Sequence, residues 1–378
     1  MKKRQFLMAA IALAAASVAQ AQDPIKIGLI VPMTGPFAST GRQVENNVKL
    51  FQALNGSTVA GRKVEVLLKD DAGVADTTRR LAQEMILKDK VSVLAGFGLT
   101  PLAFSTAPIA TQSKTPMVVM NAATAVITER SPFIVRSGFT LPQVTAPAAE
   151  WATKSGLKRV VTLVADYGPG LDAEKTFVDS FKQGGGEVVE TLRVPMANPD
   201  FAPFLQRVRD AKPEAVFVFV PSGMGASFMK QFAERGLAQA GIRVIATGDV
   251  VDDDLLNDMG EAAVGVISAF HYSAALPSAI NKKYVADYAK ANRGERPNFH
   301  GVGAYDGMQL IYEGLKKTKG EGGQALIDAM KTVSFESPRG KFAIDPKTRE
   351  VVQEVRLHRV ERMNGQLFNV PLSNAANP

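Results

Sequence analysis

Cysteine is absent from this chain of 378 residues, so no disulfide can hold the fold together and no lipid can be carried on an N-terminal cysteine. Histidine occurs only three times. His271, His300 and His358 lie far apart and show no H-x-x-x-H or H-E-x-x-H spacing. Because a metal centre needs several converging ligands, we interpret these histidines as structural or surface residues and expect no metal.

Apolar runs of 18 or more residues are missing beyond the N-terminus, so we expect no membrane insertion of the mature chain. The first residues combine a basic KKR start, an alanine-rich apolar run and an A-Q-A pattern ending at Ala21. This predicts a cleavable signal peptide at 1–21 and a mature protein that is free in the periplasm. Removal of its three basic residues lowers the net charge from +7 to +4. The remaining basic residues are interspersed with acids, so we expect no nucleic-acid partner.

Motifs of several enzyme classes are also missing. The chain has no G-x-x-x-x-G-K-[ST] phosphate loop and no G-x-S-x-G nucleophile elbow. The acids Asp70-Asp71 and 252–254 could act as paired carboxylates. A turn after a strand and the start of a helix explain them better. We therefore expect no catalytic residue, no cofactor and no enzyme activity.

Two glycine-rich stretches need separate consideration. Residues 168–173 (GPGLDA) match the dinucleotide pattern G-x-G-x-x-A, and Glu190 follows about 20 residues later at a predicted strand end. A tight strand-to-helix turn is the better explanation, because Pro169 stiffens this loop. Residues 94–101 (LAGFGLTP) fail the same pattern at Pro101. An exported NAD-type oxidoreductase therefore stays a remote alternative.

Short β-type runs alternate with helical stretches almost throughout, which predicts an α/β fold of parallel sheets with helices on both faces. The pattern restarts near residue 142 and suggests two similar lobes. Late strands at 350–360 and 367–370, around an Asn364-Gly365 turn, suggest that the chain returns to a lobe. Predicted strands are 25–31, 63–69, 91–95, 117–120, 160–165, 188–191, 215–220 and 244–246.

Loops that follow the strands are the expected ligand site, since ligands of open α/β sheets bind at the carboxyl ends of the strands. These loops contain hydroxyls, glycines, small residues and one well-placed acid, Asp249, without a nucleophile–base set. That composition favours a reversible binding cleft. The loops are 32–40, 96–101, 121–125, 165–170, 221–225 and 247–254.

Four landmarks resemble one family: IKIG at 25–28, MTGP at 33–36, KDD at 69–71 and NAAT at 121–124. The chain resembles the periplasmic binding proteins for leucine, isoleucine and valine, which are solute receptors of ABC importers. The resemblance covers essentially all of the mature chain. It implies a type I periplasmic binding protein, a monomer of two lobes joined by three crossovers. The implied N-terminal lobe is 24–141 plus 271–348, and the C-terminal lobe is 142–270 plus 349–378.

The resemblance also implies a ligand site. The family holds the ligand carboxylate with a hydroxyl and an Ala-Ala-Thr loop, here Thr100, Ala122 and Thr124, through strong charge-assisted hydrogen bonds. Asp249 matches the acid that binds a ligand ammonium. The chain departs from the family at Thr40, where a stacking aromatic is usual, and at 221–225, where a tyrosine is usual. The full implied set is Thr40, Phe97, Gly98, Thr100, Ala122, Ala123, Thr124, Tyr167, Pro221, Asp249 and Tyr305.

Four further stretches resemble the branch of this family that binds aromatic acids such as hydroxybenzoates: 96–98, 137–142, 198–204 and 248–254. This second resemblance implies that the acid of the last stretch accepts a phenolic O–H. It also implies that Phe97 or Tyr167 stacks on the ring, with core packing an equal alternative for Phe97. We therefore predict a periplasmic solute-binding protein that closes on an aromatic carboxylate and then docks to a membrane permease. Branched-chain or other aliphatic amino acids are the second choice of ligand.

Overall fold

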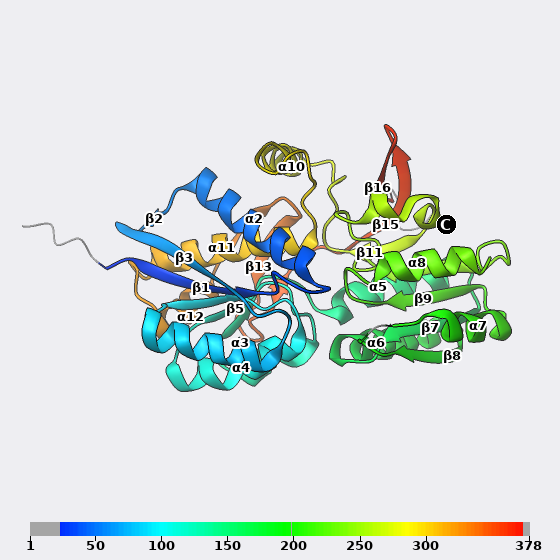
Figure 1. The fold of residues 1–378 in the computed structure, drawn as a ribbon, viewed down its shortest axis with the longest axis horizontal. Helices are drawn as coiled ribbons and strands as arrows, with labels where there is room; N and C mark the ends of the chain where they lie inside the picture. The colour runs from blue at the N-terminus through cyan, green and yellow to red at the C-terminus, as the bar shows by residue number, and fades with distance from the viewer. Residues whose placement is uncertain (1–22, 198, 373–378) are drawn as a thin grey trace, which may run out of the picture.

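The computed structural model describes residues 23–197 and 199–372. The predicted signal peptide, and the end of the predicted C-terminal lobe at 373–378, lie outside the described residues. Two α/β lobes lie side by side, each with a central sheet between helices (Figure 1). No helix within the described ranges combines the length and the apolar character that crossing a membrane requires.

The first lobe is built on a six-stranded sheet in the order β2-β3-β1-β4-β5-β6. Six of the seven residues of β1 are buried, as expected for a strand that is covered on both faces. α2 packs with α11 on one face, and α3 packs with α4 on the other (Figure 1). The strands are β1 (Ile25–Val31), β2 (Thr58–Val59), β3 (Arg62–Asp70), β4 (Val93–Gly96), β5 (Met117–Val119) and β6 (Ile134–Arg136). The helices are α2 (Ala38–Asn55), α3 (Ala75–Glu84), η1 (Met85–Asp89), α4 (Thr100–Ser113), η2 (Ala125–Arg130), α10 (Ala279–Ala291), α11 (Phe299–Lys317) and α12 (Gly323–Met330).

The second lobe has a seven-stranded sheet in the order β16-β15-β11-β10-β9-β7-β8. β9 is entirely buried, because it runs through the middle of this sheet. The strands are β7 (Arg159–Ala165), β8 (Glu187–Val194), β9 (Ala215–Phe219), β10 (Arg243–Thr247), β11 (Ile267–Phe270), β15 (Arg356–Met363) and β16 (Gln366–Pro371). The helices are α5 (Leu141–Lys154), α6 (Gly168–Gln183), α7 (Ala202–Ala211), α8 (Gly225–Glu234), α9 (Leu256–Met259) and η3 (Gly260–Ala263).

A small antiparallel sheet completes the fold, and the chain crosses between the lobes three times: after β6, after β11 and after the last strand of this small sheet. Its strands are β12 (Ser334–Ser337), β13 (Gly340–Ile344) and β14 (Val351–Val352). Val351 is buried among first-lobe side chains, and Leu357 is buried among second-lobe side chains. The boundaries assigned to the two lobes from the sequence stay a prediction.

The expected architecture of two lobes with mainly parallel sheets is confirmed. Antiparallel strands lie at the sheet edges: β2 pairs with β3, β15 pairs with β11, and β15 and β16 form the hairpin that the Asn364-Gly365 turn suggested. The strand expected at 350–360 is two strands, β14 and β15, because its two ends pack into different lobes. The β12–β14 sheet was missed, since its strands are short and alternate weakly.

Candidate ligand-binding cleft

A cleft with about 380 Å³ of empty space lies between the two lobes. It is lined by the loops at the carboxyl ends of β4 and β5 in the first lobe and of β7, β9 and β10 in the second. This is where the fold places ligands. The lining residues are Phe37, Thr40, Gly98, Leu99, Thr100, Asn121, Ala122, Ala123, Phe139, Leu141, Tyr167, Pro169, Phe219, Pro221, Ser222, Asp249 and His300.

Eight of the eleven residues that the resemblance implies line this cleft. They are Thr40, Gly98, Thr100, Ala122, Ala123, Tyr167, Pro221 and Asp249. Thr124 lies directly behind the lining, because its hydroxyl is 2.9 Å from that of Thr100. The remaining two, Phe97 and Tyr305, do not face this space.

Phe97 is fully buried in the core of the first lobe, so the structure favours core packing for this ring over stacking in the cleft. Its backbone adopts φ of +66°, and Gly96 before it adopts +109°. A side chain at Gly96 would place its Cβ 2.3 Å from the carbonyl oxygen of Ile30. These two residues therefore turn the chain sharply out of β4 and direct Gly98 and Thr100 to the cleft.

Tyr305 packs against Phe51 and Tyr284, with both pairs of ring centroids 5.1 Å apart. It lines a different hollow, together with Lys283. The reason is the rotation of the helix. Tyr305 lies five residues after His300 in α11, and each residue turns the helix by about 100°. Tyr305 therefore points roughly 140° away from the face of α11 that carries His300.

One end of the cleft is suited to an anion. Thr100 is the first residue of α4, and Gly168 is the first residue of α6 in the opposite lobe. A Cβ on Gly168 would lie 2.7 Å from Thr124 Oγ1, so the two helix starts and the threonine pair converge on one point. The first turn of a helix has backbone N–H groups without intrahelical partners and a positive dipole end, both of which favour a carboxylate.

A buried acid stands elsewhere in the lining. Asp249 is 6% exposed, and the hydroxyl of Thr247 donates to its carboxylate at 2.9 Å. Burial raises the pKa of Asp249 to about 7, and no cation in the described part of the chain opposes that rise. Burial, together with the charge of Asp249, raises the pKa of Tyr167 well above its usual range. Asp249 is therefore a strong acceptor for a ligand O–H or N–H group.

Aromatic rings form much of the remaining wall. Tyr167 stacks on Phe219 with the ring planes 16° apart, and Phe139 packs edge-on against Phe299. Phe37 and Leu141 add apolar surface. Apolar walls with a few fixed polar groups are typical of sites for small organic ligands.

His300 is a cleft residue that the sequence reading placed with structural or surface histidines. Its Nδ1 is 3.0 Å from Asn121 Nδ2, and its Nε2 is 3.3 Å from Thr40 Oγ1. Burial lowers the pKa of His300 to about 3, so the ring is neutral. The amide of Asn121 donates to Nδ1, which leaves the proton on Nε2. The sequence signal that could have located His300 is the N-cap residue Asn298, which places His300 in the first turn of α11.

The dinucleotide pattern has a structural explanation. At Gly170 a Cβ would lie 1.8 Å from the carbonyl oxygen of Ala165, so the tight turn itself requires glycine. Glu190 lies within β8 and pairs with Arg207, whereas the sequence reading placed it at a strand end. In mid-strand it cannot occupy the ribose-binding position at the carboxyl edge of the sheet. Among residues 23–197 and 199–372 there is also no cluster of three side chains able to hold a metal.

A profile of the periplasmic binding protein family matches residues 24–366. A protein of Brucella abortus (strain 2308), Leu/Ile/Val-binding protein homolog 6, is 41% identical over 376 residues, which are 98% of this chain and 96% of that protein. The fold also matches solved structures. A solute-binding protein of an ABC transporter from Rhodopseudomonas palustris BisB5, in complex with 3,4-dihydroxybenzoic acid, is 58% identical with a TM-score of 0.91, covering 93% of this chain and 97% of that one. An ABC transporter solute-binding protein from R. palustris, in complex with 4-hydroxybenzoate, is 40% identical with a TM-score of 0.90, covering 93% and 96%.

Proposed function

This chain belongs to the periplasmic binding protein family, and from that premise we propose that it captures an aromatic carboxylate, such as a hydroxybenzoate, for an ABC importer. The lobes close on the ligand, and no bond is made or broken. After export, the closed protein docks as a monomer to the permease in the inner membrane and releases its ligand there.

The observation that carries this proposal is the pairing of two unlike polar groups within aromatic walls. The Thr100 and Thr124 hydroxyls, with the starts of α4 and α6, provide donors for a carboxylate. Asp249 provides an acceptor for a phenolic O–H. Tyr167 and Phe219 provide flat surfaces for a ring.

A phenol suits Asp249 for a further reason. A carboxyl group with a pKa of about 7 is partly protonated at neutral pH, so it can either accept a hydrogen bond from a phenol or donate one to it. An ammonium group would need the ionised form. The two R. palustris proteins that bind hydroxylated benzoic acids support the same choice.

Branched-chain or other aliphatic amino acids are the second candidate ligand. The name of the Brucella relative favours them. The single buried acid in the cleft, Asp249, would then pair with the ligand ammonium.

Thermal denaturation with a panel of compounds tests the proposal. Protein stripped of any co-purified ligand by unfolding and refolding would be mixed with 3,4-dihydroxybenzoate, 4-hydroxybenzoate, benzoate, leucine or valine. A ligand at 100 times its dissociation constant adds about 2.7 kcal/mol to the free energy of unfolding. We expect this stabilisation with the hydroxybenzoates. Stabilisation by leucine or valine alone would overturn the aromatic ligand.

A further inference from the structure

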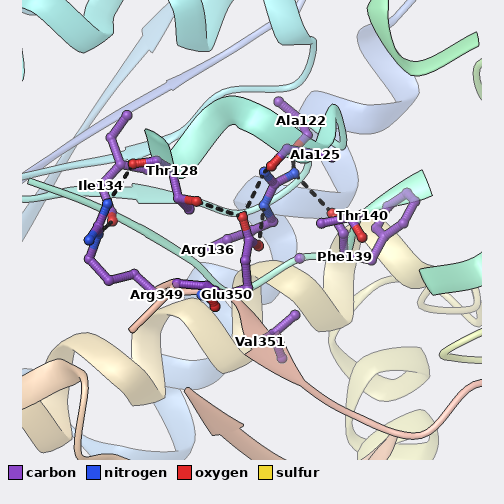
Figure 2. A network of polar contacts seen from close by, with 12 residues as sticks. Ala122, Ala125, Thr128, Ile134, Arg136, Phe139, Thr140, Arg349, Glu350 and Val351 are labelled. Carbon is purple, nitrogen blue, oxygen red and sulfur yellow. Dashed lines mark hydrogen bonds and ion pairs between the residues drawn. The ribbon is translucent and has the colours of Figure 1, made fainter. Parts of the chain in front are cut away.

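Arg136, the last residue of β6, is fully buried directly behind the anion-binding end of the cleft. Its guanidinium group donates to the carbonyl oxygens of Ala122 and Thr124, both at 2.7 Å, and to that of Phe139 at 3.1 Å (Figure 2). The loop that presents Ala122 and Ala123 to the cleft is therefore held from behind by one side chain.

The charge of Arg136 is balanced by Glu350, which stands just before the last crossover. Arg136 Nε lies 2.7 Å from Glu350 Oε2, and Nη2 lies 3.1 Å from Oε1. The hydroxyl of Thr128 donates to the same carboxylate at 2.9 Å (Figure 2). A buried charge is tolerated when it is paired and hydrogen-bonded. Arg136 Nη1 and Nη2 and Glu350 Oε1 all have hydrogen-bond partners, whereas Arg136 Nε and Glu350 Oε2 meet only as an ion pair.

By holding the carbonyl groups of the loop, Arg136 also determines where the N–H group of each of these peptides points. In a planar trans peptide the C=O and the N–H are directed to opposite sides. The Thr124 carbonyl faces Arg136, and the Ala125 N–H of the same peptide accordingly donates at 2.8 Å to Oδ2 of Asp172, the fifth residue of α6 in the other lobe. By the same rule, anchoring the Ala122 carbonyl turns the Ala123 N–H away from Arg136 and toward the cleft.

We propose that Arg136 is the positioning residue of the carboxylate site: it aims the Ala123 N–H and the Thr124 hydroxyl at the ligand anion without touching the ligand. Glu350 keeps Arg136 in place and so ties the loop to the last crossover. This inference rests on the proposed function, because it assumes that the ligand carries a carboxylate. The planar guanidinium fork is required, since it reaches four carbonyl groups and one carboxylate together. The single ammonium of a lysine has three donors and cannot reproduce that geometry.

The test compares binding of 4-hydroxybenzoate with binding of its neutral amide by calorimetry. In Arg136→Lys the loop loses its anchor and its N–H group is no longer aimed at the ligand. A misaligned hydrogen bond loses more binding free energy when the ligand group is charged than when it is neutral. We expect affinity for the acid to fall about tenfold to a hundredfold, with a smaller loss for the amide, so the acid-to-amide affinity ratio falls. General destabilisation would weaken both ligands equally and leave this ratio unchanged.

Arg339 provides the matched control. It is 1% exposed, pairs with Asp306 at 2.7 Å and donates to the carbonyl oxygen of Gly138 at 3.0 Å, but no hydrogen bond or ion pair joins it to residues 122–125. Arg339→Lys should lower stability while keeping the acid-to-amide ratio of the wild type. If Arg136→Lys does not fold, Glu350→Gln removes the charge at constant shape and should lower the same ratio by a smaller factor.

Two outcomes would overturn the positioning role and leave the proposed function intact. One is a wild-type acid-to-amide ratio in both Arg136→Lys and Glu350→Gln. The other is a fall of this ratio in Arg339→Lys as large as that in Arg136→Lys. Failure of the wild-type protein to bind any aromatic acid would instead overturn the proposed function. If the ligand panel identifies an amino acid, the same ratio is measured with that amino acid and its amide.

Discussion

The carboxyl group of Asp249 should make the stability of the ligand-free protein depend on pH. Its pKa is 3.8 without perturbation and about 7 in the folded protein, because burial disfavours the charged form. Below about pH 4 the group is protonated in both the folded and the unfolded state and has no effect. Between pH 4 and 7 the unfolded chain loses the proton while the folded protein keeps it, so the free energy of unfolding falls as the pH rises.

The size of this effect follows from the shift. Each pKa unit corresponds to 1.36 kcal/mol, so a rise of about three units destabilises the folded protein by about 4 kcal/mol above pH 7. Asp249→Asn removes the titrating group and keeps an oxygen that can accept from Thr247. The variant should therefore be more stable than the wild type by up to about 4 kcal/mol at pH 8, with no comparable gain at pH 4.

Urea denaturation of both proteins, free of ligand, at pH 4 and pH 8 measures this difference. Asp258→Asn, at an exposed carboxylate in α9, serves as the control for exchanging a carboxylate for an amide. If the gain from Asp249→Asn at pH 8 exceeds the gain at pH 4 by less than about 1 kcal/mol, the buried-acid interpretation is refuted.

Two other substitutions, and ligand binding by Asp249→Asn itself, test the cleft. Gly168→Ala should weaken ligand binding by roughly five- to a hundredfold in calorimetry, because its Cβ would lie 2.7 Å from Thr124 Oγ1; unchanged affinity would show that the lobes do not close this far. Gln43→Leu removes hydrogen bonds from α2 to Asp254 at 3.0 Å and to the Arg296 carbonyl at 2.9 Å, so affinity should fall about tenfold and small-angle scattering of the ligand-saturated protein should report a larger radius of gyration. Asp249→Asn should cost little affinity for a hydroxybenzoate but more than about tenfold for an amino acid, and the reverse order in a titration would argue against a phenolic partner for this acid.

Much of the fold could be predicted from the sequence, because it rests on local patterns. Apolar runs that are buried on both faces, such as β1 and β9, alternate with helical periodicity, and this requires parallel strands with crossover helices. In such a sheet the loops after the strands must meet at one edge. Thr100 and Asp249 were therefore expected at the cleft, and both line it.

Other features depend on contacts between residues that are far apart in the chain. His300 meets Thr40 and Asn121 only because α11 packs against α2 and β5, and Arg136 meets Glu350 across 214 residues. A helix or strand pattern carries no information on such pairs, since it reports only which face of an element is apolar.

Side-chain direction was likewise decided by the tertiary structure. Local sequence allowed either Phe97 or Tyr167 to stack on a ligand, but the left-handed turn at the end of β4 buries Phe97, and the start of α6 presents Tyr167. The sequence by itself determined the strands and helices of the two main sheets and the loops at the strand ends, because these follow from local periodicity and turn chemistry. Only the tertiary structure decided which loops face each other across the cleft and which buried charges hold them, because these depend on how the two lobes pack.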